Sequence, residues 1–141
     1  MSSFTSLLVV SPLENGKDWV LRKEFSYDVG YLGSGDTITV PAGFVTDFAS
    51  VPKAFWGILP SWDKYGQAAI LHDYLYNSLK RSRIDSDKIF LEAMEVLDVP
   101  KWKSRVMYQS VRMFGSKHYK MDIGRFLPLS GEKIEIFDLK F

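Results

Sequence analysis

The order of local patterns along the chain constrains its fold more than any other feature. Residues 20–27 and 37–40 have the β-branched or alternating composition of strands, and a glycine-rich turn at residues 33–36 lies between them. Three segments with apolar residues at helical spacing follow, at residues 68–79, 84–97 and 101–114. Because like elements come in runs and do not alternate, the sequence predicts an α+β fold.

Prolines and glycines set the limits of these segments. Residues 41–52 hold two prolines and a glycine, which predicts a fixed loop. Pro100 ends the second helix and Gly115 is a natural stop for the third. Residues 133–139 alternate like a final strand. We expect one domain over residues 1–141, divided into a β-rich part with the fixed loop at 1–60, a helical core at 66–115, and a C-terminal loop and strand at 116–141.

The helical spacing also predicts which residues each helix buries. The first helix is predicted to bury one face with Ala68, Ala69, His72, Leu75, Tyr76 and Leu79, and the second has the apolar stripe Ile84, Asp87, Phe90 or Leu91 and Met94. The third helix is largely apolar, with Trp102, Val106, Tyr108, Val111 and Phe114.

His72 and Asp87 are the residues that point most clearly to a site. A carboxylate on an apolar stripe is costly to bury alone, and His72 on the neighbouring helix is the candidate partner of Asp87. Asp85 falls on the more polar side of that helix with Glu92, so Asp87 is preferred. A carboxylate holds an imidazole in one tautomer and stabilises its cation, which allows His72 to act as a general base toward water.

Two further carboxylates indicate a metal site. Asp73 lies about 100° around the helix from His72, and Asp47 lies in the fixed loop. Carboxylate oxygens suit Ca²⁺ or Mg²⁺, and we expect carbonyl groups near residues 43–48 to complete the shell. A metal in this place would polarise an ester or phosphoryl oxygen.

Each of these residues also has a structural interpretation that the sequence leaves open. A buried His-Asp pair between two helices often only fixes their register. Tyr76 alone is typical of a core residue, and Asp47 alone is typical of a turn or a helix cap. Four aromatic residues are expected either to pack in the core or to line an apolar mouth for an acyl chain or a partner: Phe55, Trp56, Trp62 and Tyr65.

Composition excludes several classes of protein. The chain has no cysteine, which excludes disulfides and cysteine-zinc sites, and its net charge of +1 gives no electrostatic footprint for nucleic acid. The absence of cysteine is compatible with a reducing cytoplasm. No apolar run is long enough to cross a bilayer, and the first residues lack the pattern of a secretion signal. Basic residues at 80–83 and 101–105 indicate solvated surfaces or an attraction to anionic lipid headgroups.

A long, ordered string of motifs resembles an uncharacterised family that is common in bacteriophages and prophages. The matching segments are VPAGFVTDFASVP at residues 40–52, AAILHDYLY at 68–76 and DKIF at 87–90. This resemblance implies a viral origin, with the protein in the host cytoplasm or associated with the virion. It carries no assigned activity.

The helical half also resembles phospholipase A2. Residues 72–76 match the H-D-x-x-Y motif of these enzymes, residues 87–90 are similar to the D-x-x-F of their prokaryotic members, and residues 108–115 resemble their later helix. The resemblance implies a phospholipase A2-like helical core with His72 as general base, Asp87 as its partner, Tyr76 as a residue that orients Asp87, and Asp73 and Asp47 as calcium ligands. The chain departs from that family because it lacks the disulfides and a clearly matched glycine-rich calcium loop.

Two functions follow from these patterns. One is Ca²⁺-assisted hydrolysis of a phospholipid or a similar small ester. The other is a non-catalytic phage component, such as a virion, tail or host-interaction protein, that contacts other phage proteins. A His-Asp phosphohydrolase would need more histidines than His72 and His118, and His118 is expected in an exposed loop. Neither a G-x-S-x-G elbow nor a phosphate-binding loop is present.

Overall fold

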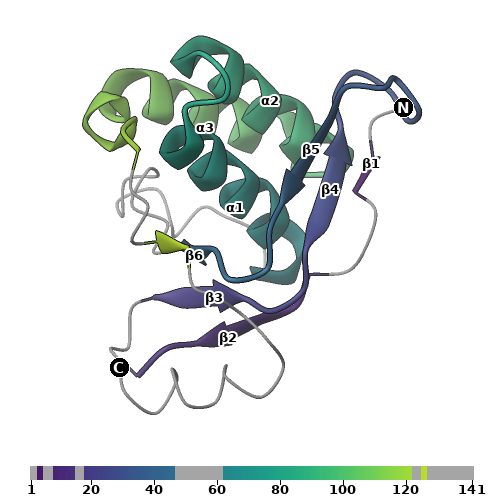
Figure 1. Cartoon of the computed structure of the whole chain (residues 1–141). Helices are drawn as coiled ribbons and strands as arrows, with labels where there is room; N and C mark the ends of the chain where they lie inside the picture. The colour runs from purple at the N-terminus through teal and green to yellow at the C-terminus, as the bar shows by residue number, and fades with distance from the viewer. Residues whose placement is uncertain (1–2, 5–7, 15–17, 47–61, 122–124, 127–141) are drawn as a thin grey trace.

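The computed structural model of the chain describes residues 3–4, 8–14, 18–46, 62–121 and 125–126. Within these residues all the strands precede the three α-helices, which is the α+β arrangement that the sequence predicts. Figure 1 shows the helices together in the angle between two small sheets. The predictions for Asp47, Phe55, Trp56, the side chain of Trp62 and the strand at 133–139 lie outside the described residues.

Both sheets are antiparallel and have three strands in the described part. The first has the order β1-β4-β5, formed by Ser3–Phe4, Phe25–Asp28 and Thr37–Val40. The second has the order β2-β3-β6, formed by Val10–Pro12, Trp19–Leu21 and Val45–Thr46. Strand β5 has the predicted bounds, and its alternating β-branched residues bury Ile38 and Val40 on one face.

The prediction of one strand over residues 20–27 is wrong, because the chain changes sheets within it. Val20 in β3 pairs with Ser11 and Val45, whereas Phe25 in β4 pairs with Val40. The break falls at residues 22–24, which are Arg-Lys-Glu and link the two strands. No glycine or proline marks this link, so the local sequence did not reveal that the two halves have different pairing partners.

The helices are α1 (Trp62–Ser78), α2 (Arg83–Val96) and α3 (Lys101–Phe114), and a short 3₁₀ helix, η2, covers Ser116–His118. The bounds of α3 are as predicted and those of α2 shift by one residue. Helix α1 begins six residues before the predicted start and continues through Gly66, which helices tolerate where packing compensates. His118 lies in η2 and is partly buried, so the expectation of an exposed loop is wrong.

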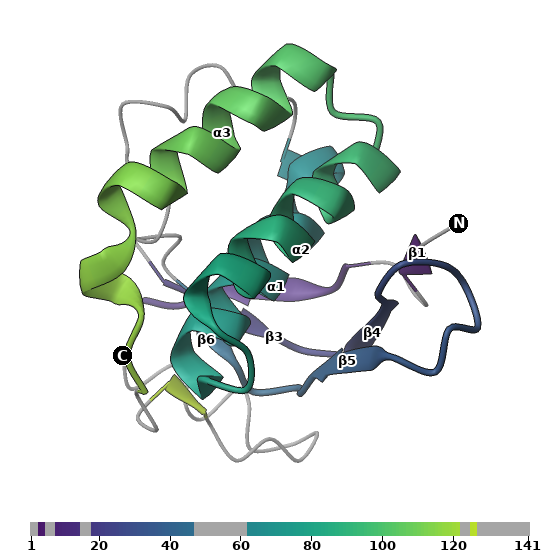
Figure 2. The same ribbon diagram turned by 90° about the horizontal axis from the view of Figure 1, so that it is seen from above.

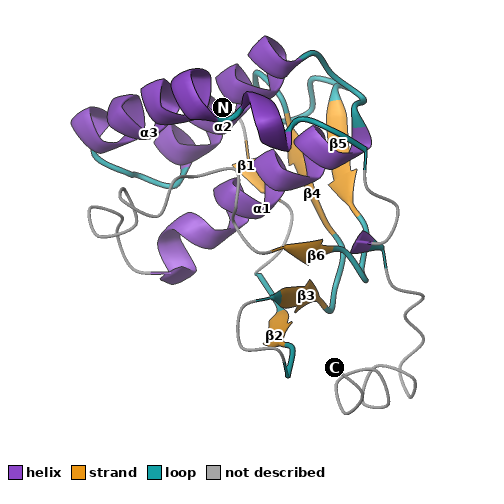
Figure 3. Ribbon diagram, turned by 90° about the vertical axis from the view of Figure 1, so that its left-hand side faces the viewer, coloured by secondary structure: helices purple, strands orange, loops and turns teal. Residues whose placement is uncertain are grey.

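The buried faces of the helices differ from the predicted ones at their ends. Leu79 and Ile84 are predicted on the buried stripes, but both are exposed. Trp102 and Phe114 of the largely apolar third helix are exposed as well. In contrast, every residue of α1 from 65 to 77 is buried. Figure 3 shows the reason, since α1 lies between the strands on one side and the other two helices on the other. Helix α1 is therefore covered on every face instead of along one stripe.

The core joins the strands to the helices. Residues of β3, β4 and β5 share one buried cluster with all three helices. Helix α2 packs against both α1 and α3, and in Figure 2 α3 lies on the outer side of the helical layer, away from the strands. No helix in the described ranges is long and apolar enough to span a bilayer.

Candidate functional site

Helix α1 holds His72 inside the protein. The side chain has no exposed surface. Its ring lies between two aromatic rings, with centroid separations of 4.2 Å to Tyr76 and 4.6 Å to Phe90. These rings fix the plane of the imidazole, and therefore the direction in which its nitrogens point.

Helix α2 brings Asp87 to His72, as the sequence predicts. The oxygen of Ser82 accepts a hydrogen bond from the backbone N–H of Asp85, so the helix starts at a fixed point one turn before Asp87. The Nε2 atom of His72 lies 2.7 Å from Oδ1 of Asp87, and both side chains are completely buried. With Asp87 ionised, Nε2 carries the hydrogen and donates it, which leaves the lone pair of the neutral ring on Nδ1.

Two further side chains hold the carboxylate of Asp87. The hydroxyl of Tyr76 donates to Oδ1 at 2.6 Å, and Nη1 of Arg112 donates to Oδ2 at 2.6 Å. Burial alone would raise the pKa of Asp87, but the hydrogen bonds from His72, Tyr76 and Arg112 outweigh it and hold the pKa below its ordinary value of 3.8. Burial and the bond to Asp87 raise the pKa of Tyr76, so its hydroxyl stays a donor.

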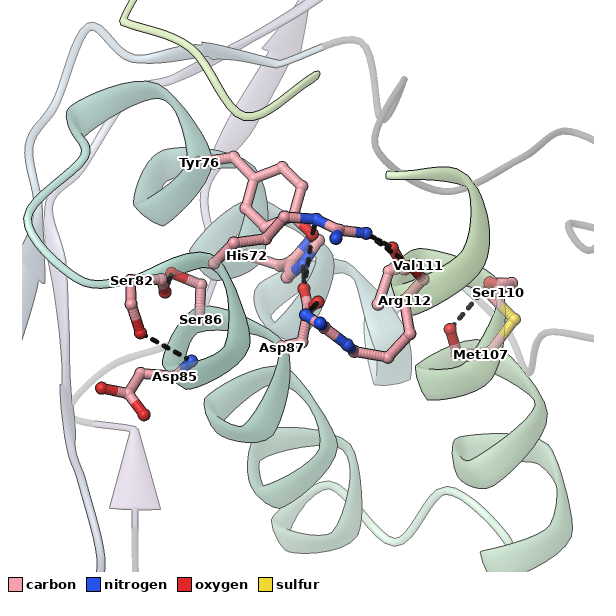
Figure 4. Close-up of polar contacts among 11 residues, drawn as sticks. His72, Tyr76, Ser82, Asp85, Ser86, Asp87, Met107, Ser110, Val111 and Arg112 are labelled. Atoms are coloured by element: carbon pink, nitrogen blue, oxygen red, sulfur yellow. Dashed lines mark hydrogen bonds and ion pairs between the residues drawn. The ribbon is translucent and has the colours of Figure 1, made fainter. Parts of the chain in front are cut away.

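Arg83 connects this network to the end of α3. Its Nη2 atom donates to the carbonyls of Val111 and Arg112, at 2.6 and 2.7 Å, and its Nε atom donates to the hydroxyl of Tyr76 at 3.3 Å. Figure 4 shows Arg112 of α3 reaching Asp87 of α2, with His72 and Tyr76 of α1 beside it. The carbonyl of Val111 also accepts from the backbone N–H of Gly115, and Arg83 adds a side-chain donor to this last turn, so it caps α3 from the first turn of α2.

Gly115 is required where α3 ends beside Tyr76. A Cβ atom at this position would lie 2.5 Å from the carbonyl oxygen of Val111 and 2.9 Å from the hydroxyl of Tyr76. Both distances are shorter than carbon and oxygen atoms tolerate. The absence of a side chain therefore lets Tyr76 reach Asp87 while α3 closes over it.

Asp73 faces a different set of partners, on the side of α1 that meets β6. Its carboxylate accepts a hydrogen bond from Thr46 at 2.6 Å and one from the side-chain amide of Asn77 at 3.1 Å. The guanidinium of Arg125 forms an ion pair with both oxygens. Arg125 also donates to the carbonyl of Val45 at 2.8 Å and lies over the ring of Phe44.

This environment fits a guanidinium and not a calcium ion. A calcium ligand must turn its lone pairs toward the cation, whereas both oxygens of Asp73 accept from N–H or O–H donors. Arg125 already supplies the positive charge that a cation would bring. Within the described residues no group of three acidic or histidine side chains could hold a metal ion. Asp47 lies outside these residues, so its role as a ligand stays a prediction.

The sequence did not reveal the three arginines of the site. Arg112 lies 25 residues from Asp87 and Arg125 lies 52 residues from Asp73, so only the tertiary fold joins each pair. Arg112 does fall in the run that resembles the last helix of phospholipase A2, but that resemblance gives it no role. Pairs that distant leave no periodic trace in a single sequence.

Comparisons with known proteins identify the family of the chain. The profile of a family described as protein of unknown function (DUF1353) matches residues 19–111, which include His72, Asp73, Tyr76 and Asp87. A relative from Sinorhizobium fredii, the uncharacterized protein y4jT, is 34% identical over 97 residues. That match covers 67% of this chain but only 28% of the relative. No solved structure matches the chain. The chain therefore belongs to the DUF1353 family.

Proposed function

We propose that this protein hydrolyses a lipid ester or a similar carboxylic ester, with His72 as the general base. The observation that carries the proposal is the 2.7 Å contact between Nε2 of His72 and Oδ1 of Asp87, in which Asp87 is itself held by Tyr76 and Arg112. A carboxylate fixed by so many donors keeps the imidazole in one orientation and one tautomer. The phospholipase A2-like order of the motifs around these residues supports a lipid substrate.

The chemistry follows from the tautomer. Nδ1 of His72 takes a proton from a water molecule while the water oxygen attacks the ester carbonyl carbon. Ionised Asp87 stabilises the imidazolium that forms. When the carbonyl reforms, the bond to the alkoxy group breaks and the imidazolium returns the proton to the leaving alcohol. The products are a carboxylic acid and an alcohol, and His72 is regenerated.

Hydrolysis by His72 requires that the substrate reach its buried imidazole ring. The ring has no exposed surface, so an ester reaches Nδ1 only when the protein opens around α1. Such openings are typical of sites that exclude water until the substrate binds. We therefore expect the protein to hydrolyse lipid in vesicles, where contact with the lipid promotes this opening, at a higher rate than a short soluble ester.

Calcium at Asp73 is not part of this proposal, because the ion pair with Arg125 opposes it. An ion at Asp73 would have to displace the guanidinium from both carboxylate oxygens. We expect no heat of binding when CaCl₂ is titrated to millimolar concentration into the wild-type protein in a calorimeter. If the wild type binds Ca²⁺ at that concentration and Asp73→Asn does not, Arg125 is not the cation that neutralises Asp73.

The role of His72 is tested by fatty-acid release from phosphatidylcholine vesicles. We expect His72→Gln to reduce the rate roughly 10²- to 10⁴-fold, the range that general-base catalysis contributes. The matched control is His118→Gln, since His118 is the second of the two histidines and lies in η2. Circular dichroism checks that both variants fold. An equal rate for wild type and His72→Gln would remove His72 as the base.

A second candidate is a non-catalytic phage component that binds other phage proteins. The complete burial of His72, Asp87 and Tyr76 favours it, because a pair without solvent access also serves to fix two helices in register. This candidate predicts no fatty-acid release from the wild type. It also predicts that His72→Gln lowers the free energy of unfolding, as measured by urea denaturation.

A further inference from the structure

Helix α3 presents its largest apolar side chains to solvent. The exposed fractions are 58% for Trp102, 69% for Met113 and 50% for Phe114. The residues that α3 buries are smaller on average and include two serines: Ser104, Met107, Ser110 and Val111. A helix that packs only within its own domain has the opposite arrangement. Packing in the core therefore does not explain why these large apolar side chains lie on the exposed face of α3.

The exposed face of α3 carries a largely apolar stripe, made of Trp102, half-buried Val106, the polar Gln109 and Met113. Trp102, Val106, Gln109 and Met113 are separated by four, three and four residues, so they share one face along the helix. The stripe runs from Trp102 to Met113 and is therefore about 17 Å long. A shallow groove of about 270 Å³ accompanies it and is lined by Arg105, Val106, Gln109, Ser110, Met113 and Phe114.

The segment that carries the stripe is basic. Residues 101–121 contain six basic residues and no Asp or Glu, although the whole chain has nearly equal numbers of basic and acidic residues. The six are Lys101, Lys103, Arg105, Arg112, Lys117 and Lys120. Among the described residues only Arg112 of these six forms an ion pair, and the ammonium group of Lys103 lies 5.5 Å from the ring centre of Trp102.

We propose that this face of α3 docks on the surface of an anionic phospholipid bilayer. Apolar side chains along the outer face of a helix, with Trp and Phe among them and Lys and Arg beside them, are the features by which helices lie in the headgroup region. The cations attract anionic lipid, while the apolar stripe enters the boundary with the acyl chains. The inference stands apart from ester hydrolysis, because a protein without activity can also bind lipid.

Co-sedimentation with vesicles tests the inference without interference from hydrolysis. The vesicles are made of ether-linked phosphatidylcholine, alone or mixed with ether-linked phosphatidylglycerol, which carry no ester to cleave. We expect the full chain to bind the anionic vesicles and not the neutral ones, and to be released by high salt. We expect Met113→Glu to weaken this binding about tenfold or more, since it puts a charge into the apolar stripe.

Leu32→Glu is the matched control. Leu32 is 64% exposed in the turn between β4 and β5, and the substitution introduces the same charge away from α3. We expect its binding to stay close to that of the wild type. Equal binding to neutral and anionic vesicles, or equal loss in both variants, would overturn the inference. It would also be overturned if wild type self-associates in light scattering and Met113→Glu restores the monomer, because the face would then join two copies.

Discussion

At the scale of single residues, Asp87 is the acceptor on which the candidate site depends. It takes hydrogen bonds from His72, Tyr76 and Arg112, which come from two other helices. Each donor is also positioned by packing, since His72 lies between two rings and Tyr76 passes beside Gly115. Removing the carboxylate would leave three buried or half-buried donors without their acceptor, a loss that typically costs several kcal/mol.

The lowered pKa of Asp87 predicts how stability depends on pH. A carboxyl group with a folded pKa below its unfolded value stabilises the protein above the unfolded pKa, and this stabilisation is lost as the pH falls through the folded pKa. We expect the free energy of unfolding of the wild type to decline below about pH 4. Asp87→Asn should start lower and decline less steeply, because its amide does not titrate.

Urea denaturation at a series of pH values measures this difference. Asp85→Asn, an exposed position on the same helix, is expected to keep the wild-type dependence. If Asp87→Asn and the wild type decline in parallel from pH 5 downward, the carboxylate of Asp87 does not contribute in the proposed way.

Sequence reasoning identified the centre of the site but not its surroundings. His72 and Asp87 could be paired in advance because each occupies a buried position on a periodic segment, where a polar group needs a partner. The positions of Arg83, Arg112 and Arg125 depend on how the helices cross and on where the chain returns after α3. The sequence predicted a metal at Asp73 because its partner Arg125 lies 52 residues later in the chain and could not be recognised in advance.

At the scale of elements, Arg83 joins the start of α2 to the end of α3. Its guanidinium bonds two carbonyls of α3 at once, which a lysine ammonium cannot reproduce with the same planar geometry. We expect Arg83→Lys to lower the free energy of unfolding by about 1–3 kcal/mol, measured by urea denaturation. Arg105→Lys, at an exposed position of α3, should change it by less than about 0.5 kcal/mol. Equal effects of the two substitutions would contradict the capping role of Arg83.

The elements themselves were partly predictable. Strand β5 and helix α3 have the predicted bounds because β-branched alternation, proline and glycine mark them locally. The division of residues 20–27 between two sheets depends on pairing with β2, β6, β1 and β5, which are far apart in the sequence. The exposure of Trp102 and Phe114 was not predictable, because an apolar series shows periodicity but not whether its partner lies inside the same chain.

At the scale of the whole molecule, α1 is the element on which both parts of the site meet. One side of α1 presents His72 to α2, and another presents Asp73 to β6 and Arg125. Its position between the sheets and the other helices explains why residues 65–77 are all buried. The proposed opening for an ester must therefore move a neighbour of α1, while the exposed face of α3 would hold the protein on the lipid.

The most direct test of the central claim compares two aspartates on one helix. Fatty-acid release from phosphatidylcholine vesicles is measured for the wild type, Asp87→Asn and Asp85→Asn. We predict that Asp87→Asn loses about 10²-fold or more, because His72 loses the anion that fixes and stabilises it, while Asp85→Asn keeps the wild-type rate. No release by the wild type, or equal rates for the two variants, would contradict the account.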